Sequence, residues 1–287
     1  MKPDHSTAAF EPARRRLLRA FVAGACACAV GARAAPKGYT LAVVPYRLPL
    51  AAHQDWGPLA EHLSERLKAH IELKVHDSFA RFEAELFRGA PDFVFMNPYH
   101  QVMAYKRAGY LPLVRSSEPL TGALVVRHDS PAASVKDLNG KILAFPSPNA
   151  FAASLYMRAL LAERHKIRFT PYYLDSHSEV YRHVILGEAA AGGGVRHTLE
   201  REPPEVRAKL RVLYETPASV SHPVAAHPRV PAAVREAATQ TILDLGAVDA
   251  ARALLNRTQL SDPVRADYRR DYRPLERLRL EHYAVLD

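Results

Sequence analysis

The chain has 287 residues, of which 48% are hydrophobic and 24% are charged, a composition typical of a globular protein with one large domain or two lobes. The formal net charge is +9, but residues 1–34 hold six of the 39 Lys and Arg and two of the 30 Asp and Glu, so the rest of the chain carries +5. The arginine-rich stretch 265–279 is interleaved with Asp, Glu and Tyr and is interpreted as a solvated face. This mild, unclustered charge argues against nucleic acid as a partner.

The first 34 residues have the layout of a signal peptide. Arg14–Arg16 supply a basic region, and Ala20–Ala32 is an apolar run too short to cross a bilayer. A small-x-small cleavage site follows at 32–34, so we expect export and removal of residues 1–34. The stretch RRRLLR also resembles a twin-arginine signal, which leaves the export route open.

Both cysteines of the chain, Cys26 and Cys28, lie in this segment. The mature chain therefore has no thiol for a disulfide, a metal or a nucleophilic attack. A lipid anchor at Cys26 is the weaker alternative, because the preceding VAGA is a poor lipobox.

Strands and helices alternate in the first half of the mature chain. We predict strands at 39–44, 71–76 and 92–96, and helices at 56–69, at 79–87 and from Pro98. Asn97 and Pro98 fit the N-cap and first position of a helix. This alternation predicts βαβ units and an α/β fold.

The second half of the mature chain continues the alternation. Predicted strands are 120–127, 142–145, 168–174, 189–195 and 221–227. Predicted helices are 150–163, which Asn149 would cap, 176–186, which opens with the capping box SHSE, and a C-terminal region from 231 onward.

Three strand-to-helix junctions stand out, at 97–100, 148–151 and 176–178. Ligands of open parallel sheets bind beyond the carboxyl ends of strands, and helix N-termini favour anions. The junctions therefore predict one cleft for a small anion. The stretch AFPSPNAFAASL has few hydroxyls and no glycine, so its backbone N–H groups are the expected donors.

The chain resembles the periplasmic phosphate/phosphite/phosphonate-binding proteins of ABC transporters. The resemblance rests on DFVFMNPYHQVMAYKRAGY, LVVRHDSPAASVKDLNGKILAFPSPNAFAASL, SHSEVYRHVILGEAAAGGGV and LRVLYETPASVSHPVAAH. It implies a two-lobed type II periplasmic-binding fold, each lobe a mostly parallel sheet flanked by helices, with the ligand cleft between lobes. Lobe I would comprise 35–125 with 226–287 and lobe II 126–225, with the chain crossing between lobes near 124–126 and 224–226.

The resemblance also implies site residues. The family loop D-P-N-S-T-S-G is matched at Pro148 and Asn149, but Ala-Phe-Ala-Ala replaces its hydroxyls and glycine. The family histidine of the second lobe matches His177, whereas the acidic residues that hold an aminoalkyl ammonium have no clear counterpart. The predicted ligand-binding residues are Tyr46, Arg47, Asn97, Tyr99, His100, Asn149, Ala150, Phe151, Ala152 and His177.

The expected function is that of a monomeric periplasmic protein, with no cofactor, that closes on a small oxyanion and delivers it to a permease. One alternative is a partner of a membrane sensor kinase, since lobe closure serves either role. Another is a ferric or other metal-binding protein, because tyrosine and histidine are ligands that ferric iron accepts. No G-x-S-x-G elbow, P-loop, Rossmann glycine set or zincin motif occurs, so we do not expect an enzyme.

Overall fold

The computed structural model describes residues 38–285, and these residues belong to one compact unit. The predicted signal peptide, with its cleavage site and Cys26, lies outside the described residues. Among the helices that are described, none is long and apolar enough to cross a membrane.

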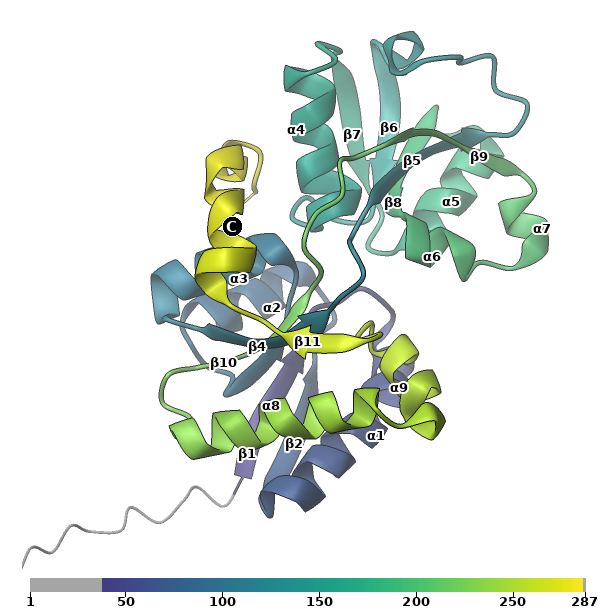
Figure 1. Ribbon diagram of the computed structural model, residues 1–287. Coiled ribbons are helices and arrows are strands. Elements are labelled where there is room, and N and C mark those ends of the chain that lie inside the picture. Colours follow the sequence, from purple (N-terminus) through teal and green to yellow (C-terminus); the bar gives the residue numbers. More distant parts are fainter. Residues whose placement is uncertain (1–37, 286–287) are drawn as a thin grey trace, which may run out of the picture. The chain divides into compact units, whose positions relative to one another are not determined.

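A six-stranded sheet and the helices packed on it form one of the two lobes, which we call lobe I (Figure 1). Its strand order is β11-β4-β10-β3-β1-β2. The strands are β1 (Gly38–Val43), β2 (His70–Val75), β3 (Phe93–Phe95), β4 (Leu111–Ser116), β10 (Pro223–Ala226) and β11 (Pro263–Arg265). The accompanying helices are α1 (Pro49–Leu67), α2 (Phe79–Phe87), α3 (Pro98–Ala108), α8 (Ala232–Gly246), the turn η3 (Asp249–Ala251) and α9 (Arg252–Arg257).

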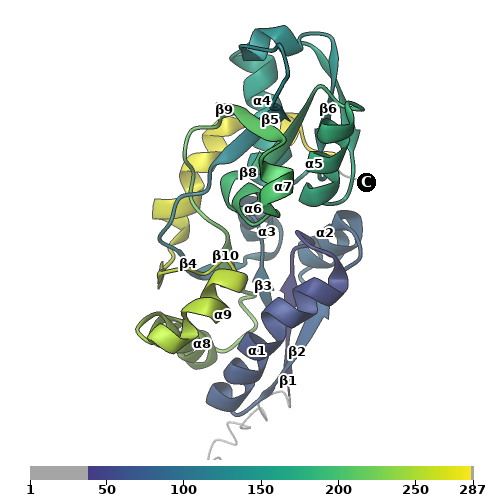
Figure 2. The ribbon, with the colours of Figure 1, turned by 90° about the vertical axis from the view of Figure 1, so that its right-hand side faces the viewer.

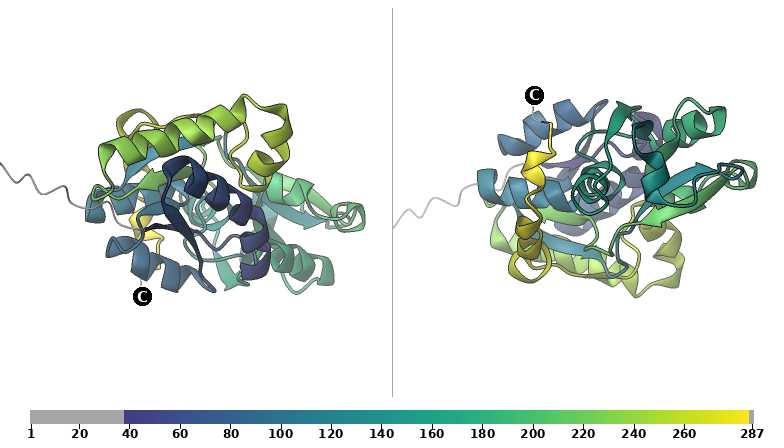
Figure 3. Two further views of the ribbon diagram at one scale, coloured as in Figure 1. Left: turned by 90° about the horizontal axis from the view of Figure 1, so that it is seen from below. Right: turned by 90° about the horizontal axis from the view of Figure 1, so that it is seen from above.

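The helices of lobe I cover both faces of the sheet. The order β3-β1-β2 means that the β1-α1-β2 and β2-α2-β3 crossovers run in opposite directions. Right-handed crossovers then place α1 and α2 on opposite faces. In agreement, α1 packs beside α8 and α2 packs beside α3 (Figure 3).

A five-stranded sheet, in the order β7-β6-β8-β5-β9, organises the other half, lobe II (Figure 2). Its strands are β5 (Gly122–Arg127), β6 (Lys141–Phe145), β7 (Phe169–Tyr173), β8 (Ala191–Val195) and β9 (Leu210–Glu215). Its helical elements are the short η1 (Val135–Leu138), the π-helical turn η2 (Phe151–Leu155), α4 (Tyr156–Glu163), α5 (His177–Leu186), α6 (Arg196–Glu200) and α7 (Pro204–Arg207).

Both sheets are mixed, whereas the sequence predicted mostly parallel sheets. β1 pairs in parallel with β2 and β3, but β10 is antiparallel to β3 and β4. Similarly, β6 is parallel to β7 and β8, while β5 is antiparallel to β8 and β9. The antiparallel strands β5 and β10 are those that the chain enters after leaving the other sheet.

The two connections between the sheets are residues 117–121 and 216–222, joined by a bridge between Leu120 and Ser219. The crossings that the sequence predicted, near 124–126 and 224–226, fall inside β5 and β10. Each of these strands belongs as a whole to one sheet. We keep the two-lobe division as a proposal, with β5 in lobe II and β10 in lobe I.

The segment after β11, residues 266–285, is a third link between the lobes, and we call it the C-terminal strap (Figure 1). It consists of the short helical turns η4 (Tyr268–Tyr272), η5 (Arg273–Leu278) and η6 (Leu280–His282). Tyr268 and Tyr272 pack on Val102 of lobe I. Leu280 packs in one cluster with Phe151, Leu155, Tyr156 and Ala159 of lobe II.

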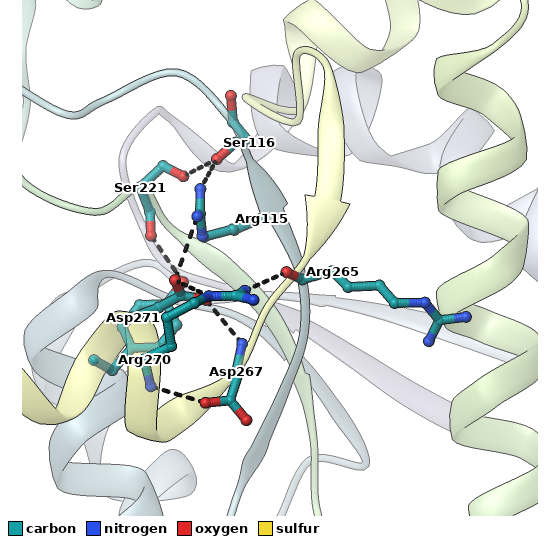
Figure 4. A network of polar contacts seen from close by, with 8 residues as sticks. Arg115, Ser116, Ser221, Arg265, Asp267, Arg270 and Asp271 are labelled. Atoms are coloured by element: carbon teal, nitrogen blue, oxygen red, sulfur yellow. Dashed lines mark hydrogen bonds and ion pairs between the residues drawn. The ribbon is translucent and has the colours of Figure 1, made fainter.

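A polar network fixes the start of the strap to the connections between the sheets (Figure 4). Asp271 is bonded by the guanidinium groups of Arg270 and Arg115, at 2.8 and 3.3 Å. Although burial raises the pKa of Asp271, these bonds and the Asp267 N–H lower it to about 2. Ser221 Oγ donates to Ser116 O at 2.6 Å. The network therefore joins the end of β4, the residues before β10 and the strap.

Candidate functional site

A small cavity of about 40 Å3 lies between residues of the two lobes. This volume counts the space open to the centre of a water-sized sphere, and one buried water molecule needs about 10–15 Å3 of it. The cavity therefore admits a group of only a few heavy atoms. Its lining from lobe I is Val44, Pro45, Tyr46, Phe79, Asn97 and Gln259, and His222 is added by the connection before β10. Its lobe II lining is Pro146, Ala150, Phe151, Ala152, Ala153, Asp175, His177, Val195 and Thr198.

The π-helical turn η2 brings backbone N–H groups to this cavity. Ser154 N and Leu155 N donate to Ala150 O at 2.9 and 3.0 Å, which makes them the first helical hydrogen bonds of the turn. The N–H groups of residues 151–153 precede these bonds, and such groups at a helix start have no intrahelical acceptor. Since residues 151–153 line the cavity, their N–H groups are available to a bound anion.

Glycines in β8 allow η2 to lie this close to the sheet of lobe II. A Cβ at Gly193 would lie 2.6 Å from Phe145 Cδ1 and closer still to the Ala153 carbonyl oxygen. A Cβ at Gly122 in β5 would clash in the same way with Ala152. The small residues of AAAGGGV therefore serve the packing of the turn that carries the N–H groups.

Two further helices begin beside the cavity. At the start of α3, Asn97 Oδ1 accepts from His100 N at 2.8 Å, and its Nδ2 donates to Asn149 O at 3.0 Å. At the start of α5, Ser176 Oγ accepts from Glu179 N at 3.2 Å, which is one of the two bonds of the predicted capping box. Ser176 N donates to Leu174 O at 2.7 Å instead of to the Glu179 side chain. His177 is the first residue of that helix.

Two histidines line the cavity: His177 from lobe II, and His222 from the connection that precedes β10. Burial, and secondarily His197, lowers the pKa of His177 to about 4. Burial also lowers the pKa of His222 to about 3, with smaller contributions from His100, His177 and His197. Both rings are therefore neutral at neutral pH, and each has one donor and one acceptor nitrogen. His177 Nδ1 is buried without a partner among the described residues, and the His222 ring stacks on Phe95 at 5.4 Å.

Tyr46 closes the lobe I side. Its hydroxyl accepts from Trp56 Nε1 at 3.1 Å. Burial raises the Tyr46 pKa to about 12, so the hydroxyl keeps its proton. That proton is donated to Arg257 O at 3.3 Å.

The described residues that line the cavity include an acidic side chain, Asp175, but no lysine or arginine. The one cation among the predicted site residues, Arg47, pairs with Asp55 at 2.8 Å. It lines a wider outer cleft together with His177, His197 and Arg201. Anion recognition in the inner cavity would therefore rely on N–H dipoles and neutral hydrogen bonds.

The structure brings six of the ten predicted ligand-binding residues to the cavity: Tyr46, Asn97, Ala150, Phe151, Ala152 and His177. Arg47 lies in the outer cleft. The other three point elsewhere. Tyr99 packs against Phe151 in the cluster around Leu280, His100 is fully buried against Glu83, and Asn149 bonds Glu83 and Val285. That these ten residues contact a ligand stays a prediction.

The predicted cap of η2 is wrong. Ala150 is the N-cap residue, without a side-chain cap bond. Asn149 precedes it, and its carboxamide is engaged by Glu83 and by the strap.

Sequence reasoning missed several lining residues: Phe79, Asp175, Thr198, His222 and Gln259. His222 stood in the quoted stretch SVSHPVAAH, immediately before β10, and this position at the end of a lobe connection was the available signal. Gln259 and Thr198 had no local signal, because only the tertiary fold brings them to the cavity.

Metal binding was an alternative from the sequence. Within residues 38–285, no group of three or more His, Cys, Asp or Glu side chains is arranged to hold a metal ion.

Comparison with known proteins gives a family. The sequence profile described as "ABC transporter, phosphonate, periplasmic substrate-binding protein" matches residues 41–272. A comparison with curated proteins finds no match.

Solved structures of low sequence identity share the fold. PhnD1 from Prochlorococcus marinus, in complex with methylphosphonate, has a TM-score of 0.78 at 15% identity, covering 87% of this chain and all of its own. A binding protein component of an ABC phosphonate transporter from Pseudomonas aeruginosa has a TM-score of 0.74 at 14% identity, covering 84% and 85%. XAC2383 from Xanthomonas citri, bound to ATP, has a TM-score of 0.72 at 17% identity, covering 87% and all of its own chain.

These likenesses confirm the predicted two-lobed periplasmic-binding fold, and proteins of this kind are solute-binding proteins and not enzymes. Because the matching profile spans most of the chain, this protein belongs to the family of periplasmic substrate-binding proteins of phosphonate ABC transporters.

Proposed function

We propose that this protein is exported to the periplasm, closes on a small oxyanion of the phosphonate, phosphite or phosphate type, and delivers it to an ABC transporter. The observation that carries the proposal is the inner cavity of about 40 Å3 at which the N-terminal residues of η2 and α5 and two neutral imidazoles converge. Its donors suit oxygen atoms that carry negative charge, and its volume suits a ligand of few heavy atoms.

This chain lacks the hydroxyl-rich loop of the family, but in this proposal the hydrogen-bond donors to the oxyanion are backbone N–H groups and histidine rings. Backbone N–H groups of residues 151–153 keep their place whichever side chains they carry. His177 and His222 supply the side-chain hydrogen bonds. Phe151 adds an apolar wall, which would suit a short alkyl or hydrogen substituent on phosphorus.

Thermal unfolding of residues 35–287 in phosphate-free buffer tests the proposal. The panel contains methylphosphonate, 2-aminoethylphosphonate, phosphite, phosphate, sulfate, ferric citrate and divalent metals. A ligand at a hundredfold excess over its Kd stabilises the folded state by about 2.7 kcal/mol. A selective shift with a phosphorus oxyanion supports the proposal, whereas shifts with metals or sulfate alone would overturn it.

A variant pair locates the site. His222→Ala removes a cavity-facing ring and should weaken binding of the selected oxyanion by about tenfold, since one net hydrogen bond to a charged group is worth about 1.5–3 kcal/mol. His128→Ala, at an exposed position after β5, is the matched control. Equal affinities in the two variants, measured by calorimetry, would contradict the assignment of His222 to the site.

Delivery to a permease is the step that family membership supports. Uptake of the selected oxyanion by cells with and without the protein tests it. A sensor role would instead leave uptake unchanged and alter the output of a kinase.

A further inference from the structure

A polar network links lobe I, lobe II and the C-terminal strap beside the cavity, and its central residues Glu83, His100 and Asn149 lie outside the cavity lining. Its centre is Glu83 on α2, whose Oε1 lies 2.7 Å from His100 Nε2 on α3. Both Glu83 carboxyl oxygens accept from Asn149 Nδ2 at 3.0 Å. Asn149 belongs to the loop between β6 and η2, so these bonds cross from lobe I to lobe II.

The Asn149 carboxamide also pairs with the strap. Its Nδ2 donates to Val285 O at 2.7 Å, and its Oδ1 accepts from Val285 N at 3.0 Å. Its backbone carbonyl accepts from Asn97 Nδ2 at 3.0 Å. Asn149 is thus bonded by lobe I and by the strap at once, and it immediately precedes Ala150, which lines the cavity.

The hydrogen bonds of Glu83 lie in a buried, apolar environment. His100 is fully buried and Glu83 is 7% exposed. The rings of Phe79, Phe82 and Phe87 lie 5.4–6.2 Å from the His100 ring. Hydrogen bonds in such apolar surroundings are electrostatically stronger than in water, and a partner left unpaired there is costly.

We propose that Glu83 is a positioning residue for ligand retention: it holds Asn149, and with it the N–H groups of 151–153, only while the lobes are together. This inference rests on the proposed function of lobe closure on a ligand. The Glu83–His100 contact lies within lobe I and persists when the lobes separate. The Glu83–Asn149 contact breaks, so the network slows opening and ligand release without touching the ligand.

Exchanging the carboxylate of Glu83 and the amide of Asn149 between the two positions tests the proposal. Asn149→Asp removes the Nδ2 donor and faces Glu83 with a second carboxylate. Glu83→Gln removes the acceptor charge but keeps the size. In the double variant Glu83→Gln/Asn149→Asp, the new amide on α2 donates to the new carboxylate on the loop, so the interlobe bond returns with its direction reversed. Glu85→Gln, on the same helix but paired with His76 at 3.1 Å, is the matched control.

The first readout is dissociation of methylphosphonate by stopped flow. Asn149→Asp should accelerate dissociation at least about tenfold, which corresponds to about 1.4 kcal/mol, with association changed much less. The double variant should recover most of this loss, although Val285 O stays without its donor. Stability of each ligand-free variant in urea is measured in parallel, and Asn149→Asp should lower it less than it accelerates dissociation.

The second readout is amide hydrogen exchange of residues 147–153 without ligand. It reports the fraction of molecules whose lobes are together, so it tests the network even if methylphosphonate does not bind. Exchange should be faster in Asn149→Asp than in Glu85→Gln and slower again in the double variant. Additive effects, with no recovery in the double variant, would overturn the inference. Failure of the wild-type protein to bind any phosphorus oxyanion would instead overturn the proposed function, while exchange still decides the role of Glu83.

Discussion

Substitution of Gly193 by alanine should damage both the stability of lobe II and the anion site. Gly193 lies in β8 directly beneath the turn η2. An added Cβ would lie 2.6 Å from Phe145 Cδ1 and closer to the carbonyl oxygen of Ala153, whereas ordinary contacts of a Cβ begin at 3.4 Å. Because one of these neighbours is backbone, η2 must move by about 1 Å.

The size of the effect follows from this geometry. Overpacking of a well-packed interior costs about 1–3 kcal/mol, and Phe145 is fully buried, so it has little room to yield. The displaced residues 151–153 carry the N–H groups proposed to bind the anion. A misplacement of about 1 Å therefore weakens those bonds, and loss of one corresponds to about 1.5–3 kcal/mol of binding.

The assay is urea unfolding in phosphate-free buffer together with calorimetric titration of methylphosphonate. Gly57→Ala is the matched control, since a Cβ there meets nothing within 4 Å inside α1. Removing a helical glycine should stabilise that control by about 0.5–1 kcal/mol. Wild-type stability and affinity in Gly193→Ala would refute the argument that β8 glycines place the anion-binding turn.

Three further outcomes are expected. Because the pKa values of His177 and His222, about 4 and about 3, lie below the ordinary value of 6.5, the unfolded state binds protons more readily. Ligand-free stability should then fall as pH drops below 6.5, by up to about 2 kcal/mol for each histidine at pH 5. Urea midpoints at pH 7.5 and 5 measure this, and a smaller drop in His177→Gln/His222→Gln supports it. Leu280→Ala should cost about 2–5 kcal/mol, as for other buried leucines, while Leu50→Ala, 73% exposed, should cost little; equal urea midpoints for the two variants would contradict the anchoring of the strap. Trp56, the only tryptophan, bonds the cavity residue Tyr46, so its fluorescence should change on ligand binding and respond less in Tyr46→Phe; identical responses would argue against Tyr46 as the link.

Local signals in the sequence predicted much of the fold. The helix at 79–87 has the predicted ends, and the N-cap at Ser176 and the stop at Gly187, with φ of 78°, are both present. The predicted capping box is formed only in part, because Ser176 N donates to Leu174 O and not to the Glu179 side chain. Helix starts and stops depend on hydrogen bonds within a few residues, so they can be inferred from short stretches. α1 begins at Pro49, earlier than predicted, because its first turns lack the leucine spacing used to recognise it.

The site could be predicted only in part, because several of its contacts are remote in sequence. Asn149 resembles a helix cap locally, but its partners Glu83 and Val285 lie 66 and 136 residues away. His222 reaches the cavity only because β10 returns to the sheet of lobe I. The strap carries no regular hydrophobic period, since it is built of short 3-10 and π turns, and its role in linking the lobes was therefore not predicted.

The position of Val285 has a practical consequence for anyone preparing this protein. The carboxamide of Asn149, which precedes the cavity turn, is bonded to the backbone of Val285. A purification tag, reporter domain or linker joined directly after Val285 would begin next to Asn149 and compete with those bonds. Fusions are therefore better joined ahead of β1, whose first residue, Gly38, pairs with His70 in the sheet of lobe I.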